Sequence, residues 1–103
     1  MIKSVAVRDI PPHEDGVTAK FNAQGYVATK KQTMKNIHFT SSVVGKYFIY
    51  KNDELLAVLF TNSKNLNADY RHDLQLKKND VISFRVQNQD YAPADMYVSF
   101  EVV

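Results

Sequence analysis

The chain has 103 residues, the size of one ordinary domain, and 45% of them are apolar, which excludes wholesale disorder. Thirteen lysines and arginines against eleven acidic residues leave a net charge of +2, too small to indicate binding to nucleic acid or to an anionic membrane. The absence of cysteine excludes disulfides and thiolate metal sites, and no apolar run reaches the ~20 residues of a membrane span. The first residues also lack the basic segment and apolar core of a signal peptide, so we expect no leader.

Short alternating segments dominate the chain, and each is bounded by glycine, proline, asparagine or aspartate. Such turn residues recur at roughly ten-residue intervals, which is typical of an all-β domain. Within the segments every second side chain is apolar, as in a strand with one face on a core and the other in water. The alternation predicts strands at residues 5–7, 37–39, 74–76, 81–86 and 96–102.

Two neighbouring segments depart from this alternation. Residues 47–50 are apolar on both faces, which predicts a central strand or a strand beneath an interface. Residues 54–60 contain good helix formers, so their composition leaves a short helix and a strand open. A strand is favoured because residues 51–53 form a turn signal that suits a hairpin, and because so short a helix is marginal without packing.

These segments predict an all-β fold: one domain over residues 1–103, an antiparallel, jelly-roll-like β-sandwich of about seven or eight strands with little or no helix. The last strand runs to residue 103 without a polar tail, which predicts an unprotected sheet edge. With the double-faced strand at residues 47–50, this edge predicts a homo-oligomer, with a trimer favoured. The predicted core consists of Ile37, Phe39, Ile49, Leu74, Leu76, Ile82, Phe84, Val86, Val98 and Phe100.

The sequence patterns that accompany catalysis are absent. There is no Gly-x-Ser-x-Gly elbow, no glycine-rich phosphate loop, and no pair of histidines at metal-ligand spacing. We therefore expect no enzymatic activity, no bound metal and no cofactor.

A polar stretch near residue 70 is the strongest candidate for recognition. Residues 62–73 predict one long loop. Its end combines the aromatic face of Tyr70, the bidentate donor Arg71 and a second donor, His72, and this set suits a sugar or a protein surface. Tyr91, in the loop after residue 86, would join this set if both loops share one end of the sandwich. In the alternative hypothesis, the arginine pairs with Asp69 or Asp73 and binds nothing. The candidate contact residues are Tyr70, Arg71, His72 and Tyr91.

Three stretches carry a resemblance to a known family. Residues 45–50 read GKYFIY, residues 74–86 contain Leu-x-Leu, an Asn79-Asp80 turn and an alternating strand, and residues 97–100 read YVSF. Together they resemble the trimeric C1q and tumour-necrosis-factor-like jelly rolls, although Asn79 and Glu101 stand where that family has glycine. The resemblance covers residues 37–103 and implies a jelly roll that trimerises.

In overall character the chain resembles small bacteriophage virion proteins, because it is short, asparagine-rich, cysteine-free and composed of strand segments. Tail, baseplate and receptor-binding proteins have this character. The resemblance implies a structural or adhesion module of the virion, made in the host cytoplasm. Its partners would be further copies of itself, other virion proteins or host-surface glycan. A free-standing carbohydrate-binding module is the alternative.

Overall fold

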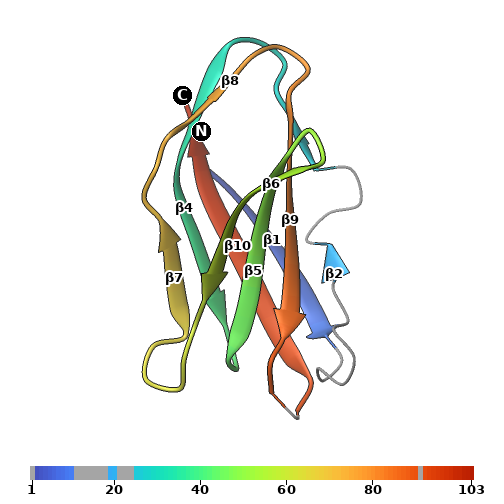
Figure 1. Cartoon of the computed structure of the whole chain (residues 1–103), viewed down its shortest axis with the longest axis vertical. Coiled ribbons are helices and arrows are strands. Elements are labelled where there is room, and N and C mark those ends of the chain that lie inside the picture. The colour runs from blue at the N-terminus through green and yellow to red at the C-terminus, as the bar shows by residue number, and fades with distance from the viewer. Residues whose placement is uncertain (1, 11–18, 21–24, 91) are drawn as a thin grey trace.

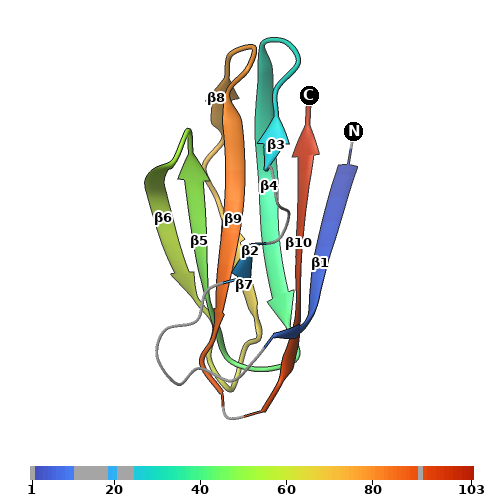
Figure 2. The ribbon, with the colours of Figure 1, turned by 90° about the vertical axis from the view of Figure 1, so that its right-hand side faces the viewer.

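The computed structural model describes residues 2–10, 19–20, 25–90 and 92–103. These residues form ten strands in two antiparallel sheets that pack face to face (Figure 1, Figure 2). They form no helix, so this part of the chain has no helix long and apolar enough to cross a membrane. The strands are β1 (Ile2–Ile10), β2 (Ala19–Lys20), β3 (Tyr26–Val27), β4 (Gln32–Ser41), β5 (Gly45–Lys51), β6 (Glu54–Phe60), β7 (Asn67–Tyr70), β8 (Leu74–Leu76), β9 (Val81–Asn88) and β10 (Ala94–Val102).

The strand order is that of a jelly roll. One sheet has the order β1-β10-β4-β7, and the other has the order β2-β9-β5-β6. The short strands β2 and β3 both pair with β9 and share one position in their sheet. In the same way β7 and β8 both pair with β4. The ten strands therefore occupy eight positions. Eight positions in two Greek-key sheets make a jelly roll, which confirms the predicted all-β antiparallel sandwich.

The β5–β6 hairpin settles the ambiguous segment in favour of a strand. Lys51 pairs with Glu54, so the turn between the strands consists of two residues. These are Asn52 and Asp53, with φ of 50° and 65°. Two successive positive φ values define the type I′ turn, which matches the twist of a hairpin and which asparagine and aspartate tolerate. As predicted, β5 is a central strand, lying between β6 and β9.

The core lies between the two sheets and contains a connected group of aromatic rings. Phe39 stacks on Tyr47, with 4.6 Å between ring centroids, and meets Phe84 edge-on at 5.7 Å. Phe84 in turn lies 5.7 Å from Phe100. The predicted core residues are buried except Leu74, which is half-buried and packs against the core. Buried apolar residues outside that prediction are Ile10, Ala28, Met34, Tyr47, Ala68, Ala94, Met96 and Val102.

Two predictions about connections and edges were wrong. The last strand, β10, lies between β1 and β4, so the C-terminal strand is not a sheet edge. The stretch 62–73 is not one loop, because β7 interrupts it and pairs with β4. β6, in contrast, pairs on one side only among the described residues and forms an open edge of its sheet.

Candidate functional site

A polar hollow of about 370 Å³ lies over the paired strands β4 and β7. Antiparallel pairing sets His38 directly opposite Asp69 on the outer face, and sets Ile37 opposite Tyr70. Because successive side chains of a strand point to opposite faces, the buried Ile37 fixes His38 on the outside. The lining residues are Asn36, Ile37, His38, Asp69, Tyr70 and Arg71.

The centre of the hollow is a hydrogen bond between His38 and Asp69. Nδ1 of His38 lies 2.6 Å from Oδ1 of Asp69, and the two side chains are 40% and 51% exposed. A carboxylate can only accept hydrogen bonds, so the proton of this hydrogen bond is on Nδ1 of His38. In the neutral ring Nε2 is then left as an acceptor, whereas a protonated ring donates from both nitrogens. The pair therefore offers a ligand either an acceptor or a donor.

A β-bulge shapes one wall of the hollow. The pairing of β4 with β10 shifts between the pairs His38↔Ser99 and Lys35↔Glu101, and Asn36 within this shift has a φ of 55°. Nδ2 of Asn36 donates to Oε2 of Glu101 at 3.0 Å. A bulge redirects side chains locally, and here it places an amide beside the His38–Asp69 pair.

The structure brings together only part of the predicted contact set. Tyr70 ends β7, where it is half-buried and packs against the core, and its ring centroid lies 5.3 Å from that of the exposed His72. Arg71 is exposed and, among the described residues, forms no ion pair with Asp69 or Asp73. Tyr91 lies outside the described residues, so its proximity to the others stays a prediction.

The hollow supplies polar groups suited to binding. A nucleophilic mechanism needs a hydroxyl hydrogen-bonded to the imidazole and donors for the oxyanion. Ser99 lies opposite His38 on β10, but the described part of the chain has no hydrogen bond between their side chains. The geometry thus supplies donors, acceptors and an aromatic edge, which are the groups that recognise hydroxyls and carboxylates.

The second candidate surface is the outer face of the other sheet, and we call it the apolar face. Cross-strand pairing aligns Phe60 with Lys46, Val58 with Phe48, and Leu55 with Tyr50. Phe60 is 66% exposed, Leu55 49% and Val58 36%. The rings of Phe48 and Tyr50 stack with centroids 6.4 Å apart. The apolar face consists of Phe48, Tyr50, Leu55, Val58 and Phe60, together with Lys46 and Arg85.

The two cations of the apolar face lie over aromatic rings. Nζ of Lys46 is 5.3 Å from the ring centroids of both Phe48 and Phe60, and the guanidinium carbon of Arg85 is 5.1 Å from that of Tyr50. Neither cation forms a salt bridge among the described residues. Cation–π contacts hold charge without an acidic partner, so these residues cover the aromatic rings while keeping their positive charge.

The chain is similar to known proteins in structure but not in sequence. No protein-family model and no curated protein matches it. It is similar in structure to a chain in the acidic stable capsid structure of Helicobacter pylori bacteriophage KHP30. The TM-score is 0.48 and the sequence identity 12%, over 100% of this chain and 97% of that chain. At these values the likeness identifies neither a family nor a function.

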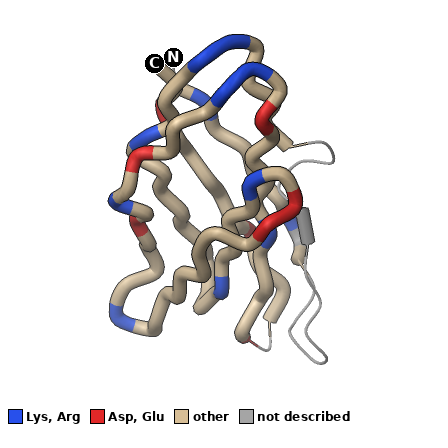
Figure 3. Tube along the Cα trace, turned by 45° about the horizontal axis from the view of Figure 1, so that its top comes forward, with Lys and Arg blue, Asp and Glu red and all other residues tan. Residues whose placement is uncertain are grey.

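Sequence reasoning missed the His38–Asp69 pair and foresaw the apolar face in part. Residues 37–39 alternate and so place His38 outward, but its partner is 31 residues away on β7, within the stretch predicted as loop. The double-faced character of residues 47–50 did signal the apolar face. Charge gave no further guide, because Figure 3 shows lysine, arginine and acidic residues scattered over several turns and edges rather than gathered on one face.

Proposed function

We propose that the chain is a non-enzymatic structural or adhesion module of a phage virion, and that it assembles as a homo-oligomer through the apolar face. The observation that carries this proposal is the exposure of Leu55, Val58 and Phe60 on the open edge strand β6. Contiguous apolar surface is rare on soluble monomers and marks contact sites. Open edge strands are normally protected by charge or cover, so the face is expected to be covered in the working assembly.

A further copy of the chain is the proposed occupant, and a trimer the proposed state. In a twofold dimer the patch contacts the equivalent patch of the other copy, which brings together two positively charged patches, each with Lys46 and Arg85. In a threefold ring each copy presents the patch to a different surface of its neighbour. The unpaired positive charge on the apolar face therefore favours the ring. Jelly rolls occur widely in viral shells and lectins. This supports a chain that is made in the host cytoplasm and located in the virion.

The test compares the two outer faces by sedimentation equilibrium. Phe60→Ser removes the most exposed aromatic ring of the apolar face, and Tyr97→Ser removes a 37% exposed ring from the outer face of β10 as a matched control. We expect the unaltered chain and Tyr97→Ser to sediment as trimers and Phe60→Ser as a monomer. A clean monomer of the unaltered chain at high micromolar concentration would refute the homo-oligomer. Detection of the chain in purified particles by mass spectrometry tests the virion location.

A second function, recognition of host-surface glycan or of a neighbouring virion protein, is favoured by the polar hollow. Arg71 is exposed without an ion pair among the described residues, and it lies beside the His38–Asp69 pair and Tyr70. A free guanidinium next to an aromatic ring suits a carboxylate or hydroxyl ligand. Arg71→Ala is expected to lower adsorption to host cells, with Lys64→Ala on the neighbouring turn as the control. Equal adsorption of both variants would leave the hollow a solvated surface.

A further inference from the structure

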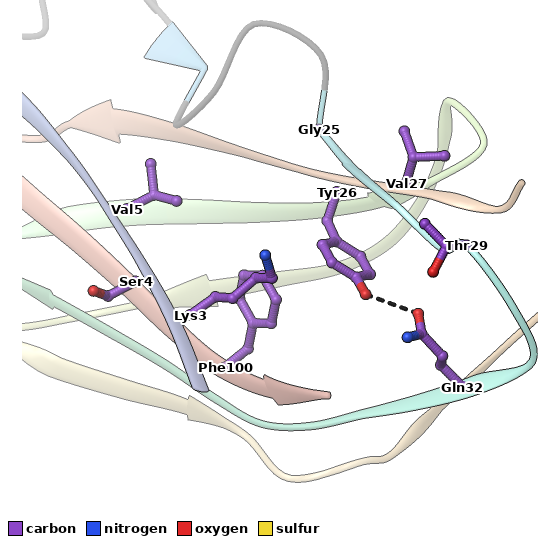
Figure 4. A pocket seen from close by; sticks show the side chains of 9 residues that line it. All are labelled: Lys3, Ser4, Val5, Gly25, Tyr26, Val27, Thr29, Gln32 and Phe100. Carbon is purple, nitrogen blue, oxygen red and sulfur yellow. Dashed lines mark hydrogen bonds between the residues drawn. The ribbon is translucent and has the colours of Figure 1, made fainter. Parts of the chain in front are cut away.

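A second cavity, of about 530 Å³, opens between the edge strands β1 and β3, and none of its lining residues belongs to the hollow or to the apolar face (Figure 4). β1 and β3 belong to different sheets, and the side chains of the described residues leave the space between these strands open. Sites for small molecules have volumes of about 300–1,000 Å³, so the cavity has the size of a binding site.

The wall of the cavity is aromatic. The rings of Tyr26 and Phe100 meet edge to face, with centroids 5.6 Å apart and planes at 70°. Phe100 is buried, whereas Tyr26 is half-buried and points into the cavity from β3 (Figure 4). Such a ring offers an apolar surface to a ligand while its hydroxyl keeps a polar partner.

The polar groups of the cavity are mainly donors. The hydroxyl of Tyr26 donates to Oε1 of Gln32 at 2.7 Å, which fixes the amide and leaves its NH₂ group as a donor. Nζ of Lys3 lies 5.6 Å from the Tyr26 ring centroid and, among the described residues, has no carboxylate partner. No acidic side chain lines the cavity among these residues. The hydroxyl of Thr29 adds a further polar group to a surface that favours an anionic, acceptor-rich ligand.

We propose that this cavity binds an acidic sugar, a pyranose ring that carries a carboxylate. The carboxylate accepts hydrogen bonds from Lys3 and from the amide of Gln32, and the ring lies against Tyr26. A neutral sugar leaves the ammonium of Lys3 without a partner. A small inorganic anion fills little of the volume and makes no use of the aromatic wall. The cavity shares no lining residue with the apolar face.

Titration of the intact chain with three probes, followed by NMR chemical shifts, tests the proposal. Glucuronic acid and glucose differ only in a carboxylate against a hydroxymethyl group, and acetate supplies the carboxylate alone. We expect glucuronic acid to bind about tenfold or more tightly than either other probe, as a charge-assisted hydrogen bond provides. The shifts are expected at Lys3, Tyr26 and Gln32. Equal affinity for glucose, equal affinity for acetate, or no binding of glucuronic acid would each overturn the proposal.

Substitutions assign the binding to this cavity. Lys3→Met removes the charge and keeps the length of the side chain, and Lys64→Met makes the same change on the exposed turn between β6 and β7, which does not line the cavity. We expect Lys3→Met to weaken glucuronic acid binding about tenfold and to leave glucose unaffected, while Lys64→Met changes neither. Equal loss in both variants would show non-specific attraction and overturn the site. If Lys3→Met does not fold, Lys3→Gln, which keeps a polar edge-strand residue, gives the same comparison.

Discussion

The two outer faces of the sandwich differ in what they present to their surroundings. On β1, β10 and β4 the outward positions include Ser4, Ser99 and His38, which are polar and aligned across the strands. On β5 and β6 the outward positions include Phe48 and Phe60, with Phe60 66% exposed. Both sheets cover the same core with their inner faces, so the core does not explain the difference.

On the proposed function this contrast reflects the environment of each outer face. A face in contact with water is free to be polar, and Ser4, Ser99 and His38 follow that rule, while Tyr97 on β10 is a 37% exposed exception. A large apolar patch on an outer face marks a contact site. On the proposed function a further copy of the chain covers the apolar face, and comparing substitutions on the two faces tests this.

The largest expected effect comes from the core that both sheets share. Phe84→Ala removes a ring packed between Phe39 and Phe100 and is expected to lower the free energy of unfolding by about 3–5 kcal/mol. Phe60→Ala on the apolar face is expected to change the stability of the dilute monomer by less than about 0.5 kcal/mol, as surface substitutions do. Urea unfolding measures both. Similar costs would mean that Phe60 belongs to the core and that the apolar face is not an outer surface.

A smaller effect is expected on the polar face. The hydrogen bond between His38 and Asp69 joins half-exposed side chains, and water competes with it. A double-mutant cycle of His38→Ala and Asp69→Ala is therefore expected to give a coupling of at most about 1 kcal/mol. A clearly larger coupling would show that this pair stabilises the fold rather than facing solvent as a ligand contact.

The smallest effect concerns Asp80, at a turn that belongs to neither face. Its carboxylate accepts hydrogen bonds from the backbone N–H of Lys77 at 2.8 Å and from Nδ2 of Asn52 at 3.1 Å. Nζ of Lys51 lies 3.7 Å from the same carboxylate. These contacts hold the pKa of Asp80 below its ordinary value of 3.8, so folding favours the charged form. The resulting stability is complete above the unfolded pKa and is lost as the pH falls through the lower folded pKa.

Asp80→Asn is accordingly expected to lower the melting temperature slightly at neutral pH, with a difference that shrinks as the pH falls below 3.8. Thermal unfolding at several pH values measures this difference. The measurement is made on the dilute monomer, because Asp80 bonds to Asn52 in the hairpin that carries the apolar face. A constant or widening difference at low pH would contradict the role of the carboxylate.

Local features of the chain were predictable from the sequence. The alternation of residues 81–86 and 96–102 placed Phe84 and Phe100 in the core, where the structure has them. The hairpin at residues 45–60 also followed from sequence, because its turn lies between strands that are neighbours along the chain. Local patterns determine which side of a strand is buried, and they determine pairing when only a tight turn intervenes.

Pairings between distant segments were not predictable in the same way. The alternation of residues 37–39 does not specify whether β4 lies beside β7, β10 or another strand. The His38–Asp69 contact depends on that choice and on the register, since a slip of one residue would turn Asp69 inward. The covered position of β10 was missed for the same reason, because β1 is its partner from the other end of the chain.

The pairing of β1 with β10 sets an order for folding during synthesis. Among the described residues, β1 has β10 as its strand partner, and β10 is synthesised after every other described strand. The β5–β6 hairpin closes through Asn52 and Asp53 alone and is complete long before that point. Non-local strand pairs form slowly, because a long chain must first be brought together. The strands that carry the apolar face, β5, β6 and β9, are thus synthesised before β10 can pair with β1.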